Sequence, residues 1–433
     1  MVGAIPVFYG RVVAALVSLA ALIVSPAQVY CVGIVVDAME EDQSLGKLGR
    51  TRVSALYALA LLFSAPVILL HMRALALVSR KTLVALSGSL FCASCLLLAK
   101  TSGEVSLMLV WTLQQLVGPG LLFPAVELAL LHWWSERRGQ VSAAVQSTGA
   151  LLGMLFLPAV LSASTCNDGD CWRSAYMALG VALILPVGVV ALLLVEGGAI
   201  DYDLQLDGAA PLHPEPPAAS AEAPSLDAAQ QPFDEEMLAL NPAERWTLHE
   251  ALTHTAFWLA QVSFSAVHAI VNAFIFHRVD LMRDVGLPES KAMSLQALVA
   301  ISCMLCTPAG LFIRRKEQLL IVALLLAAAG LLTLVHNHTP SGLYVSSMLI
   351  GCAFGVTNGY STVIWEYFFG RSDAERIKQT SIAITSATSG SAIWAFAISR
   401  AEVGTYQSCM NSLAVVALIL AGIESLALAK PEL

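Results

Sequence analysis

The chain has 433 residues, of which 57% are hydrophobic and only 12% are charged, and its mean hydropathy is +0.74. Soluble domains carry about 25% charged residues, so this composition excludes a soluble globular protein and indicates a polytopic membrane protein. The formal net charge of −8 comes largely from one central segment, so it predicts no nucleic-acid partner.

Apolar runs long enough to cross about 30 Å of hydrocarbon as helices recur on both sides of that segment. Membrane β-strands would alternate apolar and polar residues, and these runs do not. The expected spans of the first half are 11–35, 53–72, 82–99, 105–133, 140–162 and 173–195. Those of the second half are 256–279, 292–313, 318–336, 343–369, 378–399 and 407–429. The sequence therefore predicts an all-α membrane protein with twelve transmembrane helices in two pseudo-symmetric six-helix halves, residues 1–195 and 251–433.

The first expected span is interrupted near its middle by Ser25-Pro26-Ala27-Gln28-Val29-Tyr30. Unpaired backbone and amide groups are costly against lipid. One interpretation is therefore a local helix break that faces a cavity. The alternative is a proline kink with Gln28 bonded to a neighbouring helix.

The fourth expected span and its counterpart in the second half, the tenth, both carry glycines and polar side chains. Interrupted helices at corresponding positions of two repeats are typical of a transport site at the membrane midplane. The residues concerned are Gln115, Gly118, Pro119, Gly120 and Glu127 in the fourth span and Gly355, Asn358, Gly359, Tyr360 and Glu366 in the tenth.

The cysteines of the apolar spans are predicted to pack within helices, and a zinc site is not expected. Cys92 and Cys95, like Cys303 and Cys306, have CxxC spacing, but no histidine or further cysteine lies near enough in sequence to complete a zinc site. Cys166 and Cys171 bracket a short loop predicted to lie outside, where they would form a disulfide in an oxidising compartment and otherwise remain free thiols.

A polar segment, residues 196–250, separates the halves. Its part from 211 to 232 is rich in Pro, Ala and acidic residues and has almost no large apolar side chains, so it cannot offset the entropy of ordering. We expect a largely disordered cytoplasmic linker. Thr247 and Glu250 form a Thr-x-x-Glu capping signature, which predicts a short interfacial helix at its end.

The seventh expected span carries His268 and Asn272 four residues apart, on one helix face. His268 is predicted either to couple transport to a proton or to be a hydrogen-bonded core residue. Arg278 follows near the predicted outer surface, where snorkelling to the interface is favoured over binding substrate.

Orientation follows from the basic residues. With both termini in the cytoplasm, fourteen Lys and Arg residues fall on inner segments and nine on outer ones. This moderate bias predicts cytoplasmic termini; it leaves open which membrane houses the protein.

Several stretches resemble the monocarboxylate-porter-like branch of the major facilitator superfamily, which includes oxalate and monocarboxylate transporters. The stretch from His132 to Gln140 resembles its WF-x-x-RRG signature, followed by Ser147-Thr148-Gly149 and Gly153. Three further stretches follow the family order, namely Trp246 to Trp258, Phe276-His277 and Tyr367 to Arg371. The resemblance implies a transporter that alternates access around a midplane site, with organic anions among its cargoes.

Departures from the family pattern bear on the cargo. The superfamily carries a G-x-x-x-D-R-x-G-R-R motif between its second and third helices, which should fall near residues 69–81. Here His71 to Ala74 supplies neither the glycine nor the aspartate of that motif. Arginines that relatives carry in the fourth and eighth helices appear here as Gln115 and Thr307. A carboxylate would thus meet fewer fixed positive charges than in relatives.

These observations predict a secondary transporter for a small organic solute, either a monocarboxylate carried with a proton or a neutral polar solute. A receptor or assembly subunit that keeps the fold without transport is the alternative. No nucleophile, metal or phosphate-loop pattern supports an enzyme or a cofactor, and protein partners remain open. The expected substrate-binding residues are Gln28, Tyr30, Gln115, His268, Asn272, Thr307, Asn358 and Tyr360. The expected gating or coupling residues are Glu127, Arg137, Arg138, Glu366 and Arg371.

Overall fold

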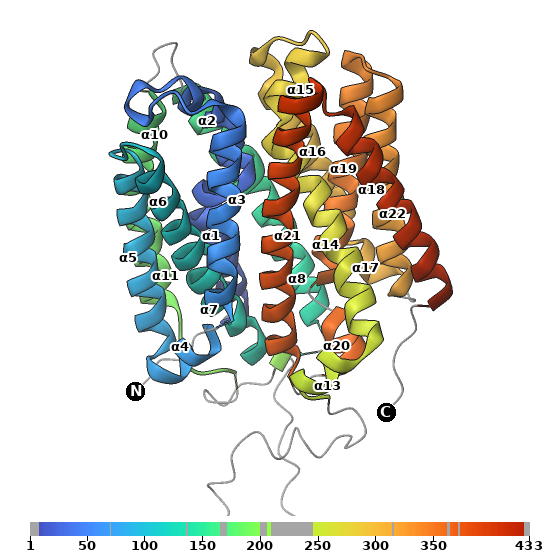
Figure 1. Cartoon of the computed structure of the whole chain (residues 1–433). Coiled ribbons are helices and arrows are strands. Elements are labelled where there is room, and N and C mark those ends of the chain that lie inside the picture. Colours follow the sequence, from blue (N-terminus) through green and yellow to red (C-terminus); the bar gives the residue numbers. More distant parts are fainter. Residues whose placement is uncertain are drawn as a thin grey trace, which may run out of the picture.

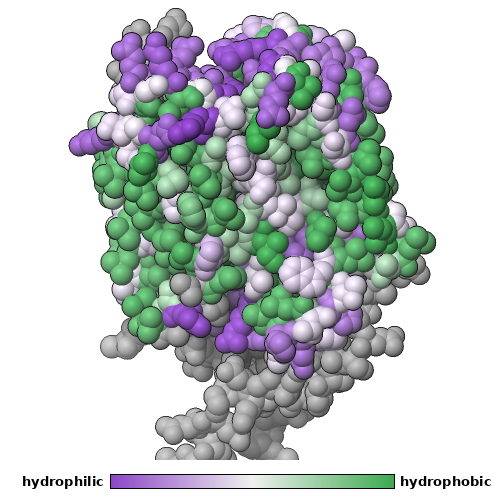
Figure 2. Space-filling model, viewed as in Figure 1, coloured by the Kyte–Doolittle hydropathy of each residue, from purple (hydrophilic) through white to green (hydrophobic). Residues whose placement is uncertain are grey.

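The protein is described here by a computed structural model, which covers residues 8–69, 71–135, 137–164, 171–199, 206–208, 246–313, 316–361, 364–370 and 373–427. Within these residues every regular element is helical. Figure 1 shows two helical bundles side by side, the first half in blue to green and the second in yellow to red. Figure 2 shows a belt of hydrophobic side chains between two hydrophilic rims, as expected for a membrane protein.

The elements of the N-terminal half follow the expected spans closely. The first span runs to Glu41, six residues beyond the predicted end. The helices of the N-terminal half are α1 (Gly10–Val24), α2 (Val29–Glu41), α3 (Gly49–Ile68), α4 (His71–Leu77), α5 (Arg80–Leu98), α6 (Glu104–Val117), α7 (Phe123–Glu127), α8 (Arg138–Leu151), α9 (Leu157–Ser164), α10 (Cys171–Ala182) and α11 (Ile184–Leu193). Shorter turns are η1 (Ser25–Ala27), η2 (Gln43–Leu45), η3 (Gly118–Leu122), η4 (Leu128–His132), η5 (Leu152–Phe156) and η7 (Leu206–Gly208).

The described part of the C-terminal half contains five helices of 20 residues or more. The helices of this half are α13 (Leu248–Thr253), α14 (Thr255–Phe276), α15 (Arg278–Asp284), α16 (Ala292–Cys306), α17 (Ala309–Phe312), α18 (Glu317–His336), α19 (Pro340–Ser361), α20 (Ile364–Phe369), α21 (Ala374–Val403) and α22 (Gln407–Ala427), with the turn η10 (Glu289–Lys291). Eleven helical segments of the described chain are long and apolar enough to cross a membrane. The eighth expected span is present as α16, of 15 residues, continued by α17 beyond Pro308. The twelve-helix prediction is thus consistent with the structure.

The two ends of the bundle differ in what they carry. We call the end with α4 and α13 the linker face and the end with α15 the opposite face (Figure 1). The first residues of the segment that joins the halves are held on the linker face, because Ala199 N–H donates to His132 O and Asp207 N–H to Trp133 O. Residues 200–205 and 209–245 lie outside the described part, so linker disorder remains a prediction. The capping box of Thr247 and Glu250 at the start of α13 is confirmed.

Three spans of the N-terminal half are interrupted at mid-depth. In the first, η1 is followed by Gln28 in an extended conformation, with φ −81° and ψ 153°, which confirms a helix break. In the fourth and fifth, η3 and η5 are π-helical turns. Such turns are frequent at functional sites.

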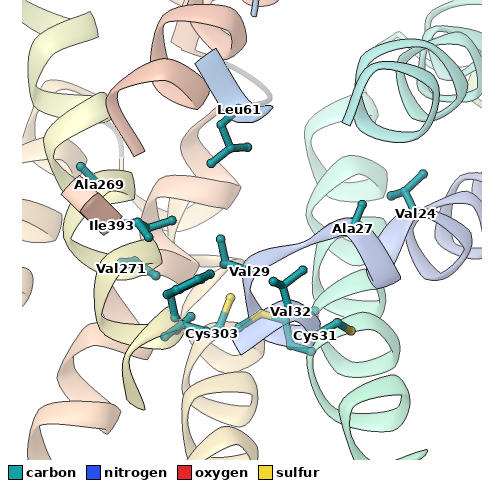
Figure 3. Packing of buried hydrophobic residues seen from close by; sticks show 14 of the residues in the cluster. Val24, Ala27, Val29, Cys31, Val32, Leu61, Ala269, Val271, Cys303 and Ile393 are labelled. Atoms are coloured by element: carbon teal, nitrogen blue, oxygen red, sulfur yellow. The ribbon is translucent and has the colours of Figure 1, made fainter. Parts of the chain in front are cut away.

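Apolar side chains from both halves form one continuous core. Figure 3 shows part of it, with Val29 and Val32 of α2, Val271 of α14 and Ile393 of α21. Cys92, Cys95 and Cys303 are buried in this packing, as predicted. Cys166 lies outside the described residues, so its disulfide with Cys171 remains a prediction.

Asp42 ties three loops of the opposite face together. Its carboxylate accepts hydrogen bonds from Ser44 N–H at 2.8 Å, Trp172 Nε1 at 3.2 Å and Arg173 Nε at 3.0 Å. Arg173 also donates to the carbonyls of Ala99 and Thr101. Burial raises the pKa of Asp42, but the hydrogen bonds from Ser44 and Arg173 outweigh it, so its pKa lies below the ordinary value of 3.8.

We expect Asp42→Asn to lower the free energy of unfolding by about 3–5 kcal/mol, because it leaves Arg173 without its buried partner. A carboxylate with a depressed folded-state pKa stabilises above its unfolded pKa, and this contribution is lost as the pH falls through the folded pKa. The gap in melting temperature between wild type and variant should therefore narrow below about pH 4. Glu289→Gln, at an exposed carboxylate of the same face, is the control. A gap that stays constant down to pH 3 would contradict the assignment.

Candidate functional site

A cavity of about 280 Å³ lies between the two halves. That volume is at the small end of the range for ligand pockets, about 300–1,000 Å³. Polar groups from both halves line it, namely Gln28, Tyr57, Gln115, Glu127, Gln146, His268, Asn272, Asn358, Ser361, Lys378, Ser381, Thr385, Ser386 and Ser389.

The wall from the N-terminal half is organised by the helix break at Gln28. The break frees the carbonyl of Ala27, which accepts hydrogen bonds from Gln115 Nε2 at 2.6 Å and from Tyr57 Oη at 2.8 Å. Gln115 Nε2 also lies 3.2 Å from Tyr57 Oη. Gln115 thus satisfies a backbone group that would otherwise be costly in this setting, while Gln28 itself faces the cavity.

The wall from the C-terminal half is formed largely by polar stripes on α14 and α21, with Asn358 and Ser361 of α19 beside them. Asn272 Nδ2 donates to Ser389 Oγ at 2.9 Å. Deeper in the same interface, Gln261 Nε2 donates to Ser265 Oγ and Thr385 Oγ1. These bonds fix the two helices relative to each other and leave hydroxyl and amide groups for a ligand.

His268 stands out because one of its ring nitrogens is buried without a polar partner among the described residues. Its ring packs against Phe264, with 4.4 Å between ring centroids, and edge-on against Phe354 at 5.3 Å. Its Nε2 atom is buried and has no hydrogen-bond partner among the described residues. The expectation of a hydrogen-bonded core histidine is therefore not met at Nε2.

Two ion pairs join the halves on the linker-face side of the cavity. Glu127 of α7 and Lys378 of α21 are 2.7 Å apart, with side chains 10% and 15% exposed, and both line the cavity. Arg138 of α8 pairs with Glu366 of α20. Each pair must break if the halves separate at this face.

The opposite side of the cavity is closed by direct contact between the halves. Arg278 is only 2% exposed; it donates to Gln296 Oε1 at 2.6 Å and to the carbonyl of Tyr30 at 3.2 Å. Gln296 in turn donates to Met154 O, and Arg283 pairs with Asp37 at 2.9 Å. The expectation that Arg278 snorkels to the interface is wrong, because its guanidinium is buried between the halves.

The structure brings together Gln28, Gln115, His268, Asn272 and Asn358, all of which line the cavity. Two expected site residues lie elsewhere. Tyr30 donates to Ser25 Oγ at 3.1 Å and is not among the lining residues, because it follows the helix break and points back towards η1. Thr307 is fully buried and donates to its own helix at Cys303 O.

Of the two remaining expected gating residues, Arg137 and Arg371, the structure describes Arg137. Arg137 is exposed, and its backbone N–H donates to Asp207 Oδ1 at 3.1 Å. Arg371 and the side chain of Tyr360 lie outside the described residues.

Sequence reasoning missed Lys378 and Tyr57 as cavity residues. A signal for Lys378 was present, since Lys378, Ser381, Thr385 and Ser389 recur at helical spacing on one face of α21. Lys378 was counted only as a basic residue near the helix start.

Comparisons with known proteins agree with this architecture. The family model described as Major Facilitator Superfamily matches residues 18–397. The chain belongs to the major facilitator superfamily. No curated protein matches it individually. Among solved structures, the chain is similar to the human organic anion transporter MFSD10 (TETRAN), with a TM-score of 0.64 and 12% identity over 96% of this chain and 99% of that one. It is also similar to an auto-inhibited POT family peptide transporter, with a TM-score of 0.63 and 14% identity over 97% and 98%.

At these identities the structural likeness shows the fold alone. Membership of the major facilitator superfamily makes the protein a multi-pass integral membrane protein and a membrane transporter. The eleven described segments long enough to span a membrane, arranged around a cavity, agree with that fold.

Proposed function

We propose that this superfamily member carries a small organic monocarboxylate together with a proton, by alternating access of the central cavity to the two faces. The linker face is taken as cytoplasmic. A neutral polar solute held by hydrogen bonds alone is the second candidate cargo.

The observation that supports this proposal is the charge balance of the cavity. Among the described lining residues, Glu127 and Lys378 are the charged pair, and the other polar groups are neutral amides, hydroxyls and the imidazole of His268. A buried charge without compensation costs several kcal/mol. Cargo that enters a charge-balanced cavity should itself be neutral overall, which a monocarboxylate plus a proton satisfies and a dianion does not.

The cavity also offers places for the proton. Protonation of His268, whose Nε2 has no partner among the described residues, would supply a positive charge in the cavity that Asn272 and Asn358 also line. Protonation of Glu127 would release Lys378 from its ion pair and leave the ammonium group for the carboxylate. Both routes couple binding of the anion to binding of a proton.

Uptake of labelled solutes into proteoliposomes, with and without an inward-acid pH gradient, tests the proposal. We expect monocarboxylate uptake to rise with the gradient and the dianion oxalate to be a poor cargo. His268→Ala should reduce monocarboxylate uptake, whereas His336→Ala, at an exposed site on the opposite face, should not. Efficient pH-independent oxalate exchange would overturn the monocarboxylate assignment. Failure to transport any solute of a broad panel would favour a receptor or assembly subunit.

A further inference from the structure

A second cavity, of about 950 Å³, opens at the linker face between the halves. This cavity shares no lining residue with the central cavity. Its lining is Leu69, Arg73, Leu75, Val78, Ser79, Arg80, Leu128 and Glu196 from the N-terminal half, with Leu248, Leu252, Arg376, Gln379 and Thr380 from the C-terminal half.

Arg80 is the least satisfied charged group in this cavity. It is the first residue of α5, after the N-cap Ser79, whose hydroxyl accepts from Thr82 N–H. Two of its guanidinium nitrogens, Nε and Nη1, are buried and have no hydrogen-bond partner among the described residues. The guanidinium of Arg80 stays charged at neutral pH. Arg80 is half-buried, and its two buried, unused donors need an acceptor that the described residues do not provide.

Among the described lining residues there is one carboxylate, and it is already engaged. Glu196 accepts hydrogen bonds from the backbone N–H groups of Arg80 at 3.1 Å and Lys81 at 2.8 Å. The Glu196 carboxylate therefore caps the start of α5 and is not hydrogen-bonded to the Arg80 guanidinium. Its negative charge still attracts that guanidinium.

Two further arginines approach from the two halves. Arg73 of α4 is exposed, and Arg376 of α21 has a side chain that is 61% exposed. Asp373 lies 3.6 Å from Arg376, but it also accepts from Leu248 N–H at 2.9 Å. The described lining of the cavity thus presents three arginines against one carboxylate, a set that favours a phosphate-type anion.

The apolar part of the lining points to the source of that phosphate. Leu69, Leu75, Val78, Leu248 and Leu252 share the cavity with the arginines. Leu77 at the end of α4 is 83% exposed, as expected for a short helix that lies at the membrane interface. A soluble phosphate would leave these apolar side chains exposed to water, whereas a phospholipid would cover them with its acyl chains.

We propose that the linker-face cavity binds the phosphate group of an anionic phospholipid between Arg80 and Arg376, with Arg73 at the rim. Because Arg80 and Arg376 belong to different halves, a bound headgroup bridges them. Anionic lipid should therefore favour the conformation in which the halves are close together at this face. This site does not depend on which cargo the central cavity carries.

The test is equilibrium binding of fluorescently labelled phosphatidylglycerol to the purified full-length protein in nanodiscs of phosphatidylcholine. We expect Arg80→Gln and Arg376→Gln each to weaken binding about tenfold or more, since each removes charge-assisted hydrogen bonds. Arg80→Lys, which keeps the charge, should lose less than Arg80→Gln. The matched control is Arg11→Gln, an exposed arginine of α1 that does not line this cavity.

Support requires saturable binding that falls in both glutamine variants and persists in Arg11→Gln, with melting curves in lipid-free detergent that show all variants folded. Equal loss in Arg11→Gln, or no preference for phosphatidylglycerol over phosphatidylcholine, would overturn the proposal. Displacement of the lipid by inorganic phosphate would assign the site to a soluble anion and overturn the lipid assignment. Binding that emerges only after Asp234, Glu235 and Glu236 are changed to amides would mean that this acidic stretch is what the arginines attract.

Discussion

Gly355→Ala is expected to lower the free energy of unfolding by more than about 3 kcal/mol, although it adds a single methyl group. A Cβ at this position would lie 2.2 Å from the carbonyl oxygen of Cys303 on α16. Gly351 and Gly359, four residues to either side, approach Val299 O and Thr307 O in the same way. The glycine stripe of α19 therefore sets how closely α16 and α19 pack, and a backbone carbonyl cannot move aside as a side chain can.

The chain provides a control of identical chemistry. A Cβ on Gly422 of α22 would meet nothing within 4 Å, so Gly422→Ala should leave the melting temperature unchanged or raise it slightly. Thermal unfolding in detergent, followed by the fluorescence of the buried tryptophans, makes the comparison. Similar melting temperatures for the two variants would show that α16 and α19 are free to separate.

Glu127→Gln and Lys378→Gln should each abolish proton-stimulated uptake and each cost about 3–5 kcal/mol of stability, because each leaves its partner charge buried and unpaired. The double variant Glu127→Gln/Lys378→Gln places two amides in contact, so it should recover most of the stability. It should not recover stimulation by a pH gradient if Glu127 exchanges the proton as proposed, since the variant lacks that carboxylate. Thermal unfolding and proteoliposome uptake separate the two effects.

The exposed pair Arg52 and Glu104 on the opposite face is the matched control, with side chains 64% and 33% exposed. The single and double glutamine variants of Arg52 and Glu104 should give a coupling energy, in the free energy of unfolding, of at most about 1 kcal/mol. Retention of pH-stimulated uptake by Glu127→Gln would exclude this carboxylate from proton coupling.

The sequence predicted the fold well because membrane helices are read from length and hydropathy alone. The break at Gln28 was also predictable, since a proline beside an amide at mid-depth needs a polar setting. Partnerships across the halves were not predictable. Lys378 lies 251 residues from Glu127, and only the approach of the two halves brings them into an ion pair.

Two expected cavity residues are not among the lining residues of the described structure. Tyr30 is expected there from its depth and Thr307 from its place in the family pattern, but neither fixes the direction in which a side chain points. The helix break turns Tyr30 towards Ser25, and the hydroxyl of Thr307 is used by its own helix. Arg278 shows the converse case, because a cation near a helix end can be drawn into an interface when carbonyls and an amide receive it.

The interruptions of the first, fourth and fifth spans give the two walls of the cavity unequal stiffness. On one side, Gln28, η3 and η5 place irregular turns at the same depth. On the other, α14 and α21 run through as uninterrupted rods of 22 and 30 residues. Bending should therefore concentrate in the N-terminal half, so that this wall adapts its shape to each solute while the other acts as the fixed template that selects among them.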